Sequence, residues 1–314
     1  MGNVLFTLAL IPVAGLLIFI YFNDKKEKEP FGFLVSLFFL GMATSVTALI
    51  SELIGMYAIG TILPEDSIAF AWVKAMLVVG PAEELGKYLV LRLRTWKNKN
   101  FNYSYDAIVY AVFVSLGFAA LENLGYVILG GGIITALMRM VTSVPGHACF
   151  AVFMGFFYSK AKYASLTNKK GKSAMFKALA MVVPIAIHGI YDAILMGASA
   201  SDDTSVMVVS IVVWIAFLIA LFVVSIILVI KSSRNDFCIV TLPDEVQTVY
   251  RPVILGGWNC ACGKTNQLNF CPNCGRSRPM ENAWYCQKCG TLSAFYFCGQ
   301  CGAPRPTAQP PVQY

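Results

Sequence analysis

The sequence predicts an all-α polytopic membrane protein with about seven transmembrane helices, followed by a small cytoplasmic zinc-ribbon module of β-hairpins. Of its 314 residues, 57% are hydrophobic and 13% charged, whereas about a quarter of a soluble domain is charged. Eight of the ten cysteines are crowded between positions 260 and 301. We therefore expect a transmembrane domain (1–230), a polar linker (231–257), a double zinc ribbon (258–306) and a disordered tail (307–314).

The membrane part is divided by its apolar runs. A spanning helix needs about 20 apolar residues, and seven stretches approach this. They lie near 4–22, 31–59, 75–91, 107–129, 140–158, 175–197 and 206–230. The first differs from a signal peptide because no basic residue precedes its apolar run and no small-residue cleavage site follows it. We expect it to be a retained span.

The connecting loops alternate in charge. Basic residues crowd the loops at 92–99 and 160–172. Three other loops have few or none: 60–74, 130–139 and 198–205. Basic loops stay in the cytoplasm, so we expect the N-terminus outside and the C-terminus inside a bacterial or archaeal plasma membrane. The segment 130–139 is expected to be a Gly-rich outer loop in which Arg139 is an anchor.

The net charge of +7 does not indicate a nucleic-acid partner. The basic residues flank the apolar stretches, as membrane topology requires. The partner that composition predicts is the lipid bilayer.

Both histidines and several carboxylates lie inside the predicted spans. These polar residues are Glu83, Glu84 and Lys87 in the third span, Glu122 and Asn123 in the fourth, His147 in the fifth, and His188 and Asp192 in the sixth. An ionised group at the bilayer centre costs roughly 3 kcal/mol or more, so their retention indicates a buried polar site. With a helical rise of about 1.5 Å per residue, we expect four of these residues to share one layer in the outer half of the bilayer. They are Glu83, Glu122, His147 and His188.

Spacing predicts two local contacts in this site. Lys87 follows Glu83 by four residues and Glu84 by three, so it can reach either carboxylate on a helix. Asp192 lies one turn beyond His188 and can hold the imidazole in one tautomer by accepting its N–H. Glu52 lies near the outer end of its span, where we expect it to reach water, and it is left out of the site.

Four motifs in order resemble the PrsW family, within the larger group that includes CAAX-processing and bacteriocin-processing membrane enzymes. They are Glu83-Glu84-x-x-Lys87, Phe118-x-x-x-Glu122-Asn123, His147 and His188-x-x-x-Asp192. The resemblance covers about 70–200. It implies an intramembrane protease that hydrolyses peptide bonds of membrane-anchored proteins, which in bacteria would be anti-sigma factors.

What the resemblance implies for the site is a set of eight candidate catalytic residues: Glu83, Glu84, Lys87, Glu122, Asn123, His147, His188 and Asp192. Either Glu83 or Glu84 would be the general base. The imidazoles and Asn123 would orient water or stabilise the oxyanion.

Two mechanisms stay open at this point. In one, a glutamate alone activates water. In the other, a divalent metal lies among Glu83, Glu84, Glu122, His147 and His188. Two other function classes also remain. A transporter or proton relay uses buried acids and histidines, although the halves of the membrane region show no repeat. A non-catalytic membrane scaffold is the third class.

The cysteine-rich segment contains two similar units of about twenty-seven residues. Their cysteines are Cys260, Cys262, Cys271 and Cys274, then Cys286, Cys289, Cys298 and Cys301. Four thiolates bind one tetrahedral zinc, so we expect about two structural zinc ions. The glycine after each pair permits the backbone to turn back toward the metal. The module has few basic or aromatic surface candidates, so its expected partner is a cytoplasmic protein and not a nucleic acid.

Overall fold

A computed structural model describes residues 2–240 without a break and parts of the segment from 258 to 305. The described residues of that segment are 258–259, 262–263, 265–266, 273, 284–290, 292–293, 297, 300 and 303–305. The chain divides into two compact units, Met1–Thr241 and Leu242–Tyr314. Each unit is described by itself.

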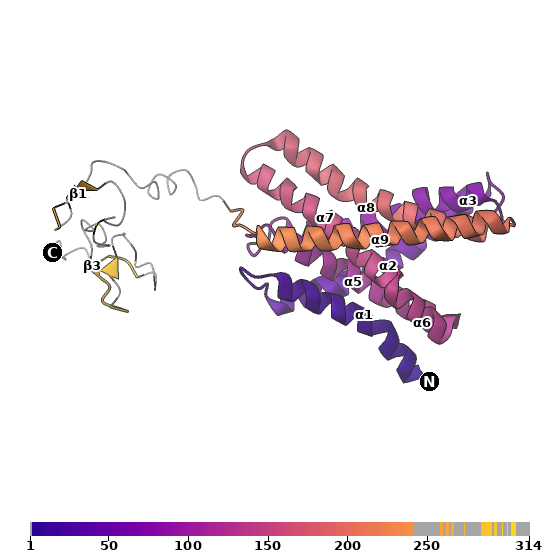
Figure 1. The fold of residues 1–314 in the computed structure, drawn as a ribbon, viewed down its shortest axis with the longest axis horizontal. Helices are drawn as coiled ribbons and strands as arrows, with labels where there is room; N and C mark the ends of the chain where they lie inside the picture. The colour runs from indigo at the N-terminus through magenta and orange to yellow at the C-terminus, as the bar shows by residue number, and fades with distance from the viewer. Residues whose placement is uncertain are drawn as a thin grey trace. The chain divides into compact units, whose positions relative to one another are not determined.

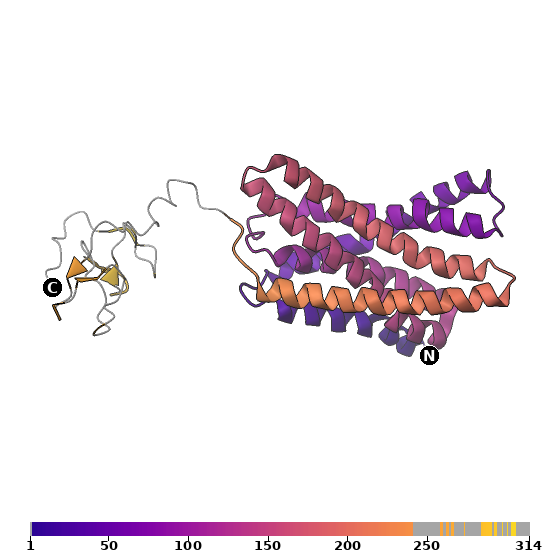
Figure 2. The same ribbon diagram turned by 45° about the horizontal axis from the view of Figure 1, so that its top comes forward.

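The first unit is a helical bundle in which α7, α8 and α9 lie side by side (Figures 1 and 2). Its helices are α1 (Gly2–Asn23), α2 (Phe31–Gly60), α3 (Ile68–Val73), α4 (Gly80–Thr95), α5 (Asp106–Tyr126), α6 (Gly132–Val141), α7 (Ser143–Leu166), α8 (Lys170–Ser199) and α9 (Thr204–Arg234). Two π-helical segments, η1 (Lys74–Val79) and η2 (Val127–Gly131), join α3 to α4 and α5 to α6.

The predicted all-α membrane fold is confirmed. Within the described residues, six helical segments are long and apolar enough to span a membrane. The seventh predicted span, 75–91, lies inside the run α3–η1–α4, which is too rich in charge to qualify by composition. This run nevertheless begins after the α2–α3 loop and ends beside the later turns of α7. At its end, the hydroxyl of Thr95 lies 3.0 Å from that of Tyr158.

The expected outer loop at 130–139 is wrong, because α6 occupies most of it. The glycines are confined to 130–132, where Gly132 takes a left-handed φ of 63° and starts the new helix. Beyond that point apolar residues return, and Ala136 is buried against α1 and η2. As a consequence Arg139 points into the protein and is not an outer anchor.

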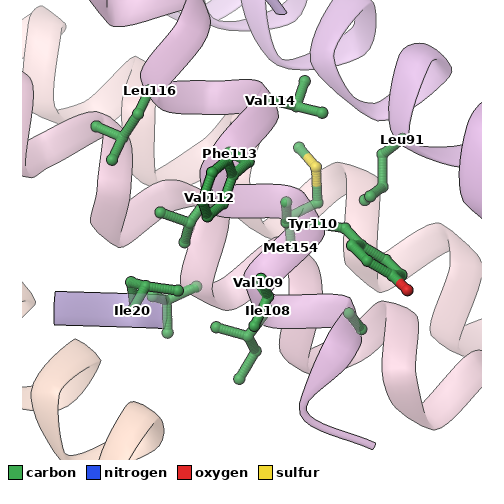
Figure 3. Close-up of a cluster of buried hydrophobic side chains, with 14 of the residues drawn as sticks. Ile20, Leu91, Ile108, Val109, Tyr110, Val112, Phe113, Val114, Leu116 and Met154 are labelled. Carbon is green, nitrogen blue, oxygen red and sulfur yellow. The ribbon is translucent and has the colours of Figure 1, made fainter. Parts of the chain in front are cut away.

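Helix α5 is the centre of the bundle. It is buried along most of its length, and α1, α2, α4 and α7 pack around it. Figure 3 shows Ile20 of α1, Leu91 of α4 and Met154 of α7 among the α5 side chains of this core. The enclosed helix carries Glu122 and Asn123 near its C-terminal end and thereby fixes their position.

Two glycines set the distance between α2 and α5. A Cβ atom on Gly41 would lie 1.9 Å from the carbonyl oxygen of Val114, and one on Gly117 would lie 1.9 Å from that of Phe38. Without side chains at these points the two backbones come into direct contact, which is how small residues bring membrane helices together. The α2 wall of the bundle is therefore held tightly against its central helix.

Among its described residues, the second unit contains two short antiparallel hairpins. Strand β1 (Trp258–Asn259) pairs with β2 (Thr265–Asn266), and β3 (Trp284–Tyr285) pairs with β4 (Leu292–Ser293). Gly263 and Gly290 each follow the first cysteine pair of a unit, and they take left-handed φ values of 85° and 72°. This conformation is expected where the backbone turns back after such a pair.

The zinc ligands of this unit stay a prediction. Cys262, Cys286 and Cys289 belong to the described residues. The other five predicted ligands lie outside them: Cys260, Cys271, Cys274, Cys298 and Cys301. The predicted tail, 307–314, also lies outside.

The close α2–α5 contact predicts a position-specific cost of a single methyl group. Gly41→Ala should destabilise the purified protein by about 1–3 kcal/mol, because the new Cβ meets backbone that cannot rotate away. Gly15→Ala in α1 is the control, since nothing lies within 4 Å of that position. It should not destabilise, because Ala favours a helix by about 0.5–1 kcal/mol over Gly. Thermal unfolding in detergent measures both, and equal effects would contradict the packing argument.

Candidate active site

The helix that carries the Glu-Glu pair begins directly after an irregular turn. Pro81 has no backbone N–H to donate to the preceding turn, and the chain before it widens into the π-helical segment η1. π-helical turns inside helices are frequent at functional sites. Here η1 is followed within one turn by Glu83 and Glu84.

Two glycines bring this turn against α8. A Cβ on Gly80 would lie 3.0 Å from the carbonyl oxygen of Ile185, and one on Gly189 would lie 3.1 Å from the Cα of Met76. The absence of these side chains lets η1 and α4 approach α8 closely. As a result His188, next to Gly189, lies beside Glu84.

Lys87 is the centre of the polar network. It is fully buried, and its Nζ lies 3.1 Å from Glu83 Oε2, 2.7 Å from Glu84 Oε1 and 3.2 Å from His147 Nδ1. The ring of Phe118 lies 3.9 Å away and offers it a cation–π contact. The structure thus has both carboxylate contacts that the spacing predicts, together with one to α7.

His147 connects this lysine to α5. Since the Lys87 ammonium can only donate, Nδ1 accepts and Nε2 carries the proton. Nε2 then donates to Glu122 Oε2 at 2.8 Å. Glu122 also forms an ion pair with Arg139 of α6, whose NH2 atom lies 2.8 Å from the same oxygen. His147 is held in one tautomer by these contacts.

Asn123 lies one residue beyond Glu122 and does not enter the central cluster. Its side-chain oxygen accepts from Arg139 Nε at 2.8 Å, and its amide donates to the carbonyl of Ala9 at 2.8 Å. The predicted oxyanion role for Asn123 finds no contact with Glu83, His147 or His188 here. It holds Arg139 against Glu122.

His188 contacts a carboxylate with each ring nitrogen. Nδ1 lies 3.0 Å from Glu84 Oε1, and Nε2 lies 3.3 Å from Asp192 Oδ2. The second contact is the one expected from their spacing. The ring of Phe150 stacks on His188 with a centroid distance of 4.6 Å. The imidazole is therefore held by a ring contact on its face and by carboxylates at both nitrogens.

A cavity of about 1000 Å³ adjoins this network. Glu83, Glu122, His147, His188 and Asp192 line it, together with apolar residues of α2 and η2. Glu84 and Lys87 are fully buried beneath it. The two neighbouring glutamates are therefore not equivalent, because Glu83 borders the cavity and Glu84 does not.

Several polar lining residues were missed by sequence reasoning, among them the charged residues Glu52, Lys74 and Arg139. Glu52 of α2 lines the cavity, although its position near a span end suggested contact with bulk water. Arg139 lines it too. The helical spacing of apolar residues after Gly132 was the signal that would have moved Arg139 from a loop into α6.

Four of the candidate residues form a compact donor set. Glu83, Glu84, His147 and His188 each offer a ligand atom, and these atoms all lie within 4.8 Å of one another. Glu122, a member of the predicted metal group, is outside this set and binds the far nitrogen of His147. Two carboxylates and two imidazoles suit a divalent metal such as zinc.

The residues that form this site all lie in the part of the chain that matches a known protein family. The model of the PrsW family of intramembrane metalloproteases matches residues 29–223, which include every predicted catalytic residue. The chain belongs to this family. The cysteine-rich module lies beyond the matched residues.

Curated relatives give the same result. The protease PrsW of Halalkalibacterium halodurans is 32% identical over 192 residues, which cover 61% of this chain and 83% of that protein. The protease PrsW of Oceanobacillus iheyensis is 36% identical over 190 residues, covering 60% and 82%. That of Bacillus subtilis is 31% identical over 191 residues, covering 60% and 82%. No solved structure matches the chain.

Membership of the PrsW family confirms the predicted class of protein. The chain is an integral membrane protein and an intramembrane peptidase. The transporter and scaffold alternatives have no such support. The roles of individual residues stay predictions.

The central position of Lys87 predicts a large effect of removing its charge. Lys87→Met should destabilise the metal-free protein by about 3 kcal/mol or more, because Glu83 and Glu84 lose their buried counter-charge. Lys172→Met, at an exposed lysine, is the matched control and should have little effect. Unfolding followed by circular dichroism in detergent measures both.

A second substitution tests whether the effect comes from the carboxylates. Adding Glu84→Gln to Lys87→Met removes one of the uncompensated charges. The double variant should recover part of the lost stability, which is a non-additive result expected only for contacting residues. Additive losses would show that Lys87 acts through packing alone.

Proposed function

We propose that this chain hydrolyses peptide bonds of membrane-anchored proteins with a water activated by Glu83, beside a divalent metal held by Glu84, His147 and His188. The observation that carries the proposal is the donor set at the cavity wall, in which four ligand atoms lie within 4.8 Å of one another. Three protein ligands with an open position for water are typical of catalytic zinc.

The residues present fit such a metal. The donor set combines carboxylate and imidazole groups, and Glu84 Oε2 is buried without a hydrogen-bond partner among the described residues. Asp192 accepts from the far nitrogen of His188, and Glu122 accepts from that of His147. Such carboxylate–histidine contacts orient metal ligands in known sites.

Lys87 sets a condition on metal binding. His147 Nδ1 cannot accept from Lys87 and bind a metal at the same time. Metal binding at His147 therefore requires the ammonium to withdraw to the two glutamates, whose oxygens it already contacts. After this movement the positive charge of Lys87 still compensates the negative charges of Glu83 and Glu84.

The division of roles between the glutamates follows from their surroundings. Glu83 lines the cavity, so its carboxylate can take a proton from a water placed there. Glu84 is enclosed by Lys87 and His188, so it positions both. A bound metal would supply Lewis-acid polarisation of the substrate carbonyl and lower the pKa of the attacking water.

The expected substrate is a membrane-anchored protein segment. Residues of α2 such as Val46 and Leu49, and Leu129 of η2, give the cavity apolar walls. Glu122 near the end of α5 and His147 near the start of α7 put the site toward the end of the bundle at which α3 begins. The low positive charge of the loops at that end supports an outer position for it. We therefore propose cleavage near the outer face of a bacterial membrane. Single-span proteins such as anti-sigma factors are the substrates that the resemblance suggests.

The proposal predicts distinct results for the two glutamates. Glu83→Gln should lower the rate of cleavage by about 10²–10⁴-fold, as expected for loss of a general base, and leave the bound metal in place. Glu84→Gln should lower both activity and metal content. Glu65→Gln, in the loop after α2, is the control and should leave both unchanged.

The assay uses the purified full chain in liposomes with a panel of single-span reporter proteins. Products are followed by mass spectrometry, and metal is counted by elemental analysis. Full activity of Glu83→Gln would refute its role as the base. Unchanged metal content in a Glu84→Gln/His188→Gln variant would leave only the mechanism in which a glutamate acts without metal. Metal held by the cysteine module is the same in every variant, so differences report the membrane site.

A further inference from the structure

A second group of buried acids lies at the other end of the bundle. Asp24 follows α1, Glu29 precedes α2, Asp106 begins α5 and Asp236 follows α9. Their side chains belong to residues that are 1%, 3%, 0% and 8% exposed. None of them belongs to the active-site network, and the proposed function uses none of them.

Two of these carboxylates are held rigidly by one oxygen each. Asp106 Oδ2 accepts from the backbone N–H groups of Asn102 and Tyr103 at 3.0 and 2.7 Å. Asp236 Oδ1 accepts from the backbone N–H of Tyr105 at 2.8 Å and from the hydroxyl of Ser104 at 2.8 Å. In each case the second oxygen is left for another partner.

Few donors serve the remaining oxygens among the described residues. The side chains of Tyr110 and Asp106 form hydrogen bonds with the Glu29 carboxyl. Both oxygens of Asp24 and Oδ2 of Asp236 are buried without a hydrogen-bond partner. The hydroxyl of Tyr105 is also buried and unpartnered there, and its electrostatic neighbours are Asp24 and Asp236. Folded proteins leave few such groups, and several together indicate a missing water or ion.

The charge of the group requires compensation. Lys28 is the neighbouring base among the described residues, and its ammonium donates to the backbone carbonyls of Tyr21 and Asp24 and not to a carboxylate. Burial raises the pKa of Asp24 to about 6, that of Glu29 to about 7 and that of Asp106 to about 9, as expected for carboxyls with little positive charge nearby. A bound cation would stabilise the ionised forms of these acids near neutral pH.

The donor atoms select the kind of cation. All of the unpartnered atoms are oxygens, with no nitrogen or sulfur, which favours a hard ion such as Mg²⁺ or Ca²⁺. In the described part of the chain, only the active-site set brings three or more ligand atoms within 4.8 Å. The acidic group is therefore more widely spaced than direct ligands of one ion, which suits Mg²⁺ because it keeps several of its waters.

We propose that Asp24, Glu29, Asp106 and Asp236 bind a partly hydrated magnesium ion at this end of the bundle. The ion joins the loop between α1 and α2 to the start of α5 and to the segment that follows α9. That segment already pairs with the loop before α5, since Ser104 N–H donates to Phe237 O at 3.0 Å and Ile239 N–H to Asn102 O at 2.8 Å. The bound ion thus holds the segment after α9, which leads to the cysteine module, against the helical bundle.

The test measures thermal unfolding of the purified full chain as millimolar MgCl₂ is added at constant ionic strength and constant zinc. No chelator is used, because it would also remove other metals. Wild type should gain about 3 °C or more in Tm in a saturable manner, since an ion that binds only the folded state stabilises it. Asp24→Asn/Asp236→Asn should lose this gain. Glu65→Gln/Asp66→Asn, a matched pair of acids in the α2–α3 loop, should keep it.

A direct binding measurement covers the case in which the double variant does not fold. Mn²⁺ serves as a paramagnetic probe for the site, and electron paramagnetic resonance counts the bound ion. Wild type and Glu84→Gln/His188→Gln, which lacks two proposed ligands of the active-site metal, should each bind an ion that Mg²⁺ displaces, whereas Asp24→Asn should bind it at least tenfold more weakly. Equal binding by Asp24→Asn and wild type, or the absence of a saturable Mg²⁺ effect on wild type, overturns the proposal. In the latter case protons or a basic side chain neutralise the acids.

Discussion

The active site depends on one buried ammonium group. Lys87 holds Glu83 and Glu84 of its own helix and reaches His147 of α7. An uncompensated charge inside a bilayer costs several kcal/mol, so the two glutamates can share this place only because the lysine lies between them. From this centre, contacts continue through His188 to Asp192 and through His147 and Glu122 to Arg139. Five helices are joined by the chain of contacts, and a shift of one is felt by the others.

The sequence was sufficient for the parts of this arrangement that are local to one helix. The Lys87 contacts with both glutamates and the His188–Asp192 contact follow from helical spacing alone. The common layer of Glu83, Glu122, His147 and His188 was predicted from the rise per residue with Arg139 as an outer anchor, although Arg139 points into the protein. Those predictions rest on distances along a helix axis, which the number of residues determines.

The rotation of each helix about its own axis could not be predicted from residue spacing. Which of Glu83 and Glu84 borders the cavity depends on the π-helical turn before α4, which changes the phase of all later side chains. Glu52 faces the cavity for a similar reason, because the rotation of α2 is set by its glycine contact with α5. Arg139 was assigned to a loop because three glycines concealed the helix that follows them. These errors concern tertiary packing, which no spacing rule records.

The enclosed position of α5 also changes how hydropathy should be interpreted in this protein. The last span, α9, is more apolar than α5, yet far less of it is buried by protein. Lipid accepts almost any apolar side chain, so the exposed residues of α9 are interchangeable as long as they remain apolar. The neighbours of α5 accept only particular shapes. The segment that looks most strongly like a membrane span thus places the weakest demands on its own sequence, and evolutionary drift should concentrate there.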